Sequence, residues 1–183
     1  MEIQQALLSR RTIHRYDQRV VQEEMIERAL QAAHHAPCHR LTFPWRFILA
    51  GPQTREAIAS LGVRLKQERS GLSPEASASA RAKLLAPDRL IVVCQAASPD
   101  PFQAKEDYAA CACAIQNLTL SLIADGVGSK WSSGAITRHP ETYRLCEVDP
   151  GGFEIIGFIW AGYPKEIPTV NRPPLESVVK ALP

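Results

Sequence analysis

The longest helical pattern in the chain runs from Lys105 to Gly126, in the stretch KEDYAACACAIQNLTLSLIADG. Apolar residues lie on nearly every side of this helix, with only small or neutral polar interruptions, and Gly126 is a suitable C-cap. Such a helix is expected to be buried on several sides. In a domain of this size, it lies either at the centre of the core or in an oligomer interface.

The remaining segments predict an α+β fold. Apolar, β-branched runs that end at glycine or proline indicate buried strands, and apolar residues at helical spacing indicate helices. Strands and helices do not alternate regularly, which argues against a doubly wound sheet. One domain over residues 1–183 is expected, with an extended, proline-rich C-terminal arm at 164–183. The predicted strands are 45–51, 89–95 and 153–164. The predicted helices are 3–8, 22–34, 53–61, 105–126 and 136–146. We also expect a mobile helical excursion outside the core at 69–85 and a glycine-flanked loop at 128–134.

The charge balance argues against a nucleic-acid partner. The chain has 21 basic and 19 acidic residues, a formal net charge of +2, so any basic cluster must act locally. The N-terminus does not resemble a signal peptide, and no apolar run approaches the roughly 20 residues that span a bilayer. We therefore expect a soluble cytoplasmic protein with no membrane partner.

The cysteines indicate neither a disulfide framework nor a metal site. There are five cysteines, an odd number, and none has CxxC spacing. This pattern fits reduced thiols in a cytosol. Cys111 and Cys113 lie two apart on the long helix and point in different directions, so they are predicted to be small core residues and not a redox pair.

The most basic stretch, SRRTIHRYD, follows the first helix. Arg10, Arg11 and Thr12 could bind a phosphate, because guanidinium groups bind phosphate bidentately and a hydroxyl completes the pocket. The commoner fate of such a cluster is a solvated charge run, and His14 and Arg15 stay open between ligand contact and surface. Apolar elements on both sides favour an anion site.

A second polar cluster follows the helix that ends near residue 34. It contains His34, His35, Cys38, His39 and Arg40. Imidazole and thiolate can bind transition metals, but His34 and His35 diverge on a helix and no acidic ligand is near. Contacts to an anionic ligand suit the cluster better than a metal, and no metal is expected.

The loop sequence WSSG combines an aromatic wall with hydrogen-bonding groups. Trp131 offers a flat apolar surface, and Ser132 and Ser133 offer hydroxyls and amides. The combination suits an aromatic ring with polar edges, although a core tryptophan beside an ordinary turn is an equally good interpretation.

Together, these stretches resemble the FMN-dependent nitroreductases, particularly the compact members of the family. The standard phosphate-binding motifs of other nucleotide-binding families are absent. No single sequence block is specific to the family, but five blocks in the order of the family are. The blocks are LLSRRTIHRYD, HHAPCHRLTFPWRFIL, KLLAPDRLIVVC, AIQNLTLSLIADGVGSKWSSG and EIIGFIWAGYPKE with the NRPPLESVV tail.

The resemblance implies a nitroreductase-like α+β fold, with a central, mainly antiparallel sheet flanked by helices. It also implies a homodimer with a long interface helix and an FMN site built from both chains. By the same resemblance, FMN is held by Arg10, Arg11 and Thr12, by His35 and His39 of the partner subunit, by Trp131, Ser132 and Ser133, and by Arg172 of the C-terminal arm.

The implied activity is an FMN-dependent oxidoreductase with no catalytic side chain of its own. NAD(P)H would reduce FMN, and nitroaromatics, quinones or similar electron-poor acceptors would then be reduced at the same face. A guanidinium such as Arg10 near the pyrimidine edge would stabilise the negative charge of reduced flavin. Dehalogenation or dehydrogenation by a flavin, or a non-enzymatic FMN-binding redox sensor, are the alternatives.

The sequence departs from the family pattern at several places, including His14, where an arginine is frequent. Thr12 replaces a common serine and keeps the hydroxyl, while Lys130 replaces a common cysteine. Phe43 stands where a glutamine is frequent, which changes the polar side of the expected substrate channel.

Overall fold

A four-stranded antiparallel sheet organises the protein. The computed structural model describes residues 1–182 and gives the strand order β1-β2-β4-β3. Strands β2 and β4 are central and almost entirely buried, as their apolar sequences predict. The strands are β1 (Trp45–Leu49), β2 (Arg89–Ala96), β3 (Gly128–Ser132) and β4 (Phe153–Gly162).

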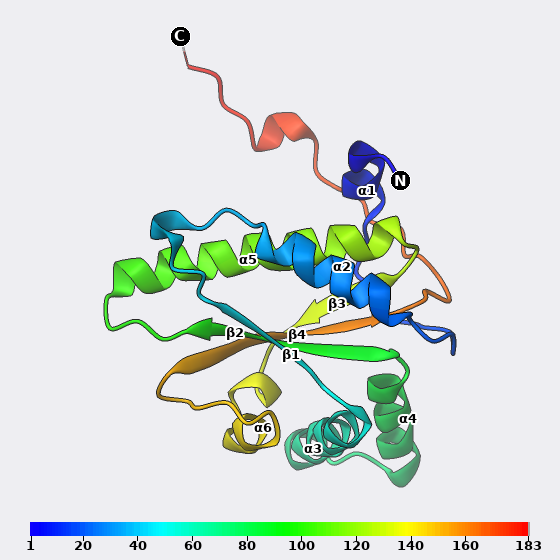
Figure 1. The fold of residues 1–183 in the computed structure, drawn as a ribbon. Coiled ribbons are helices and arrows are strands. Elements are labelled where there is room, and N and C mark those ends of the chain that lie inside the picture. Colours follow the sequence, from blue (N-terminus) through cyan, green and yellow to red (C-terminus); the bar gives the residue numbers. More distant parts are fainter. Residues whose placement is uncertain (183) are drawn as a thin grey trace.

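Helices cover both faces of the sheet (Figure 1). One face carries α2 and α5, with α1 beside the end of α5, and the opposite face carries α3, α4 and α6. The α+β class and the antiparallel sheet flanked by helices are therefore confirmed. The helices are α1 (Ile3–Ser9), α2 (Glu23–His34), α3 (Pro52–Ser70), α4 (Pro74–Leu85), α5 (Pro101–Ala124) and α6 (Pro140–Leu145), with short 3₁₀ turns at His39–Leu41, Ile136–Arg138 and Leu175–Ser177.

Helix α5 lies in the centre of one layer. Asp100 caps it by accepting a hydrogen bond from the Phe102 amide at 2.9 Å, and Leu118 and Leu122 are completely buried against the sheet. Helix α2 packs beside α5, where Arg28 contacts Asp125 at 2.8 Å. The long helix is thus a core element, as its composition predicts.

One stripe of α5 remains uncovered in the single chain. Ala109, Cys113 and Gln116 are exposed at helical spacing on the side that neither the sheet nor α2 covers. The prediction that Cys113 is a core residue is therefore wrong for one copy, whereas Cys111 is buried as predicted. The uncovered residues are small or neutral, which leaves the face suitable for close helix packing.

Two segments differ from the sequence predictions. Residues 128–132 form the edge strand β3 and not a loop, because pairing with β4 overrides the weak strand propensity of a glycine- and serine-rich sequence. The segment 69–85 is helical as predicted, but it packs on the body: Ala80 is buried, and Leu84 contacts the cluster around Phe158.

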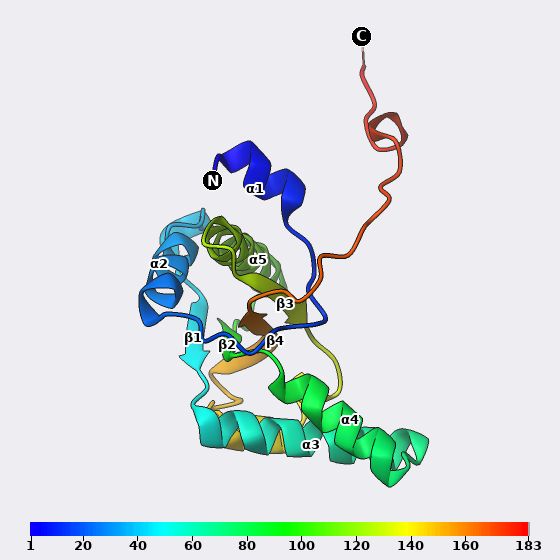
Figure 2. The same cartoon turned by 90° about the vertical axis from the view of Figure 1, so that its right-hand side faces the viewer.

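The C-terminal arm leaves the body after β4. From about residue 164 it runs beside the segment that follows α1 and then projects away from the sheet and helices (Figures 1 and 2). Its apolar side chains are exposed in the single chain, including Leu175, Val178 and Leu182. No helix within residues 1–182 has the length and apolar character needed to cross a membrane.

Gly157 makes room for the side chain of Trp131. The register between β2 and β4 shifts at Val93/Cys94, beside Gly157, and the Trp131 indole lies over the bare glycine backbone. A Cβ at Gly157 would lie 2.0 Å from the indole Nε1. The absence of a side chain at Gly157 thus allows the Trp131 indole to lie there.

Gly157→Ala should displace the Trp131 indole and lower the free energy of unfolding by about 1–3 kcal/mol, the usual penalty for overpacking. Denaturant unfolding and tryptophan fluorescence would measure both effects. The matched control is the same substitution in a Trp131→Ala background, where it should have little further effect. An equal loss of stability in both backgrounds would contradict the packing argument.

Candidate functional site

The N-terminal basic segment is fixed beside the edge strand β3. The Ile13 amide donates to the Ser129 carbonyl at 3.0 Å, and Thr12 forms a parallel bridge with Ser129. Ile13 is buried, and Gly128 has no side chain to obstruct it, since a Cβ there would lie 2.5 Å from Ile13 Cγ1. Arg10, Arg11 and Thr12 are therefore held at one edge of the sheet.

Arg10 lies in a cationic environment. Its pKa is lowered, first by burial and then by the positive charges of Arg172 and Arg11. Arg10 is half-buried, whereas Arg172 in the C-terminal arm is exposed, and its positive charge acts on Arg10. Guanidinium groups of this kind are suited to binding an anion.

Arg11 is turned back toward the first helix. Its Nη1 donates to the carbonyl of Leu8 at 2.7 Å and to that of Arg10 at 2.9 Å. The side chain therefore interacts favourably with the C-terminal carbonyls of α1. A phosphate contact from Arg11 would compete with these bonds, so Arg10 is the better placed of the two.

Beyond Ser129, the outer edge of β3 is open within the described residues. The Ser129 carbonyl points outward to Ile13, and backbone groups alternate along a strand, so Trp131 also directs its amide and carbonyl outward. The Ser132 hydroxyl instead accepts a hydrogen bond from Trp160 Nε1 at 2.9 Å. Trp131 is 37% exposed at this edge. The open edge can therefore hydrogen-bond to a planar ligand.

A cation-lined cavity adjoins the same segment. It has a volume of about 420 Å³ and lies between the N-terminal segment, α3, α4 and the β3–β4 edge. A second cavity of about 550 Å³ shares part of this lining. No carboxylate from residues 1–182 lines either one. The cationic and titratable lining residues are His14, Arg15, Lys66, Lys83, Lys130 and Lys165.

Lys83 is the main residue of this region that sequence reasoning missed. It belongs to the segment 69–85, for which the sequence predicted no role in the core, and only the packing of α4 brings it to the cavity. His14 and Arg15, left open by the sequence, both line it, and Arg15 also contacts Glu166 at 3.2 Å.

His35 and His39 lie elsewhere in the chain. His35 Nδ1 is 2.8 Å from the Gln31 carbonyl, and His39 Nε2 is 3.6 Å from Glu106 Oε2. Both follow α2 near the beginning of α5, whereas Arg10 to Thr12 lie near its end (Figure 1). Because α5 has 24 residues, the two groups are separated by a helix of about 36 Å. One chain does not bring them together.

The histidines and cysteines do not assemble a metal centre. Within residues 1–182 there is no group of three or more His, Cys, Asp or Glu side chains placed to hold a metal ion. Burial raises the pKa of the Cys94 and Cys111 thiols to about 12 and that of Cys146 to about 11, so these thiols stay protonated and unreactive.

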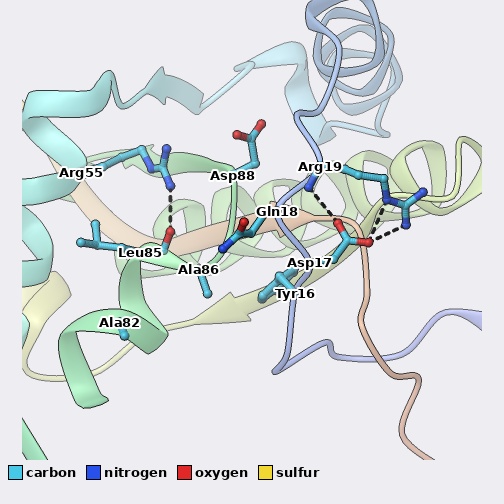
Figure 3. Close-up of a pocket in the computed structure, with 9 residues that line it drawn as sticks. All are labelled: Tyr16, Asp17, Gln18, Arg19, Arg55, Ala82, Leu85, Ala86 and Asp88. Atoms are coloured by element: carbon cyan, nitrogen blue, oxygen red, sulfur yellow. Dashed lines mark hydrogen bonds and ion pairs between the residues drawn. The ribbon is translucent and has the colours of Figure 1, made fainter. Parts of the chain in front are cut away.

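A third cavity, of about 490 Å³, has a structural explanation (Figure 3). Arg55 in its wall donates to the carbonyls of Leu85 and Pro87 and thereby caps the end of α4. Arg19 is bonded to Asp17 at 2.8 Å, while Asp88 accepts a hydrogen bond from the Val21 amide. These contacts tie the N-terminal segment and α4 to β2, and the cavity shares only Tyr16 with the cation-lined one.

Comparison with known proteins matches most of the chain to one family. The model of the nitroreductase family matches residues 7–163. The protein named "Putative NAD(P)H nitroreductase YfhC" of Bacillus subtilis is 31% identical over 167 residues, which cover 90% of this chain and 85% of that protein.

Solved structures share the fold. A nitroreductase-like family protein from Bacillus cereus has a TM-score of 0.85 and 24% identity, with 100% of this chain and 96% of that one covered. A protein from Desulfovibrio desulfuricans described as "a putative nitroreductase in complex with fmn" has a TM-score of 0.77 and 24% identity, with 100% of this chain and 98% of that one covered. The resemblance predicted from the sequence is confirmed: the chain belongs to the nitroreductase family of oxidoreductases.

Proposed function

We propose that the protein is an FMN-dependent oxidoreductase that uses NAD(P)H to reduce nitroaromatics, quinones or similar electron-poor acceptors. Membership of the nitroreductase family supports this, as do the name of the Bacillus subtilis relative and the FMN complex of a structural neighbour. The observation that carries the proposal is the arrangement at the β3 edge. Arg10 and Arg172 provide positive charge at the start of the N-terminal basic segment. That segment leads along the open backbone edge of β3 to the cation-lined cavity.

The residues present fit FMN in a definite order. Arg10 and Arg172 are suited to the phosphate, with Thr12 and Arg11 beside them. The extended segment from Arg10 to His14 spans at most about 13 Å. This length separates the anion site at Arg10 from the cavity that His14 lines. Trp131, Ser132 and Ser133 would border the ring system, as the resemblance implies. FMN, when bound, supplies hydride exchange between NAD(P)H and the acceptor.

We assign the pyrimidine edge of the flavin to the cavity side, with Lys83 as its cationic neighbour and His14 beside it. Both side chains are exposed in the single chain and line a cavity that has no carboxylate from residues 1–182. Such charges favour negative charge at the pyrimidine edge. This assignment moves the electrostatic role that the sequence gave to Arg10 toward Lys83, and leaves Arg10 for the phosphate.

We further propose a homodimer in which each FMN contacts both chains. His35 and His39 lie at the opposite end of α5 from Arg10, so a second copy must supply them. Antiparallel packing of α5 on its symmetry mate, through Ala109, Cys113 and Gln116, brings the beginning of one helix to the end of the other. The exposed apolar arm would also be covered by a second copy.

Arg10→Ala should weaken FMN binding by about 1.5–3 kcal/mol, the usual contribution of a hydrogen bond to a charged group. Arg11→Ala, the matched control, should cost less, because Arg11 already bonds the end of α1. Titration of the apoprotein, followed by quenching of flavin fluorescence, measures both Kd values. A purified protein that is colourless and gains no flavin spectrum with added FMN would reject the proposed function.

Lys83→Gln should make the reduction potential of bound FMN more negative, because it removes a positive charge from the pyrimidine edge. A loss of 1.4 kcal/mol would correspond to about 30 mV for a two-electron couple. Arg144→Gln, on the exposed surface of α6 on the face of the sheet opposite α5, is the control. Equal potentials in the wild type and in Lys83→Gln would contradict the placement of the pyrimidine edge.

Cys113 provides a test of the dimer. It lies just past the midpoint of the 24-residue helix and is exposed in one copy. Antiparallel packing about that midpoint places it near Cys113 of the partner subunit, so a short bismaleimide should cross-link the two chains. The product should be a covalent dimer, absent from Cys113→Ser. A protein that sediments as a monomer at micromolar concentration would contradict the shared site.

A further inference from the structure

The loop between α2 and β1 has a strained backbone. Arg40, Leu41 and Phe43 have φ angles of 58°, 53° and 45°, in the left-handed region that residues other than glycine rarely adopt. Strain of this kind persists where surrounding contacts over-determine the conformation, and it concentrates at functional sites. The contacts that hold this loop converge on α5.

Asp107 of α5 is the centre of those contacts. It is buried, with 5% exposure. Thr42 Oγ1 donates to Asp107 Oδ1 at 2.7 Å, and Gln103 Nε2 donates to the same oxygen at 2.8 Å. Arg40 Nη1 in turn donates to Gln103 Oε1 at 3.3 Å. One carboxylate oxygen thus ties the strained segment to the long helix.

Cys38 closes the loop from its other side. The Phe43 amide donates to Cys38 Sγ at 3.2 Å, and Thr42 Oγ1 lies 3.4 Å from the same sulfur. The thiol is half-buried by these contacts. Opening of the loop would therefore expose it, which makes Cys38 a reporter that needs no cofactor.

The strained backbone directs particular side chains outward. His39 is exposed beside Glu106. Phe43 is half-exposed and packs on His34 and Trp45, with ring centroids 5.9 Å apart in both pairs. These groups lie at the end of α5 that, in the proposed dimer, meets the Arg10 segment of the partner subunit.

We propose that Asp107 is a positioning residue, which holds the loop 38–43 so that His39 and Phe43 contact the FMN bound mainly by the partner subunit. The inference rests on the shared flavin site proposed above. Asp107 acts through Thr42 and Gln103 and itself has no contact with the ligand. Because Phe43 stands where a glutamine is frequent in the family, this wall of the acceptor channel is then aromatic and not polar.

The test compares Asp107→Ala with Asp107→Asn in a Cys113→Ser background. The other cysteines are buried, so a thiol reagent reports on Cys38 in the apoprotein. Asp107→Ala should raise both the labelling rate of Cys38 and the Kd for FMN about tenfold. Asp107→Asn should stay near the parent protein in both, because a single amide oxygen can accept the two hydrogen bonds.

Two further variants keep the test independent of folding defects. Thr42→Val removes the hydroxyl that donates to Asp107. Because this hydroxyl also lies 3.4 Å from Cys38 Sγ, the FMN Kd of the variant is the decisive readout, and it should rise as in Asp107→Ala. The double variant should add little to either single change. Thr119→Val is the control, because this buried hydroxyl of α5 donates to Gln116 within the helix.

The outcomes separate the two proposals. Labelling rates and FMN Kd values within twofold of the parent, in both Asp107→Ala and Thr42→Val, would overturn the role of Asp107 and leave the flavin site standing. Faster labelling with unchanged FMN affinity would overturn the assignment of the loop to the flavin. A parent protein that does not bind FMN at all would overturn the shared site itself. The labelling experiment would then still show whether Asp107 holds the loop 38–43.

Discussion

The packing of α5 on the sheet and beside α2 is the constraint on which the rest of the structure depends. Leu118 and Leu122 bury one side of the helix, and the ion pair between Arg28 and Asp125 fixes α2 against it. The turn that follows α5 leads directly into β3, so the same packing places the edge to which the basic N-terminal segment binds. At its other end, α5 provides Asp107 and Glu106 to the loop after α2. A single helix therefore positions both groups of residues implied in cofactor binding.

The sequence predicts the features that arise from local patterns. The central strands and the long helix follow from hydrophobic periodicity, and the structure contains both of them. The anion-binding role of Arg10 follows from the chemistry of guanidinium groups and stays a prediction. The features that it does not predict depend on contacts between distant segments. Strand β3 exists because β4 pairs with a sequence of weak propensity, and Lys83 reaches its cavity because α4 packs on the body. The exposure of Cys113 depends on which face of α5 its neighbours leave open.

Positive charge gathers around the N-terminal segment. The charges of Arg172 and Arg11 act unfavourably on the half-buried Arg10, and the adjoining cavity collects basic side chains without a carboxylate from residues 1–182. The local contacts of the backbone, such as the Ile13 to Ser129 hydrogen bond, hold these groups in position despite the repulsion. Binding of an anion relieves it, so a ligand of the proposed kind should stabilise the fold by mass action.

The separation of the two groups of residues along α5 has a thermodynamic consequence. If each cofactor contacts the end of one helix and the beginning of its symmetry mate, binding and association are linked, and each must strengthen the other by the same factor. Occupancy by the cofactor would then fall on dilution of the protein even at a constant cofactor concentration. A helix of 24 residues, by keeping the two halves of the site apart, would in this way make the active form a cooperative function of the amount of protein present.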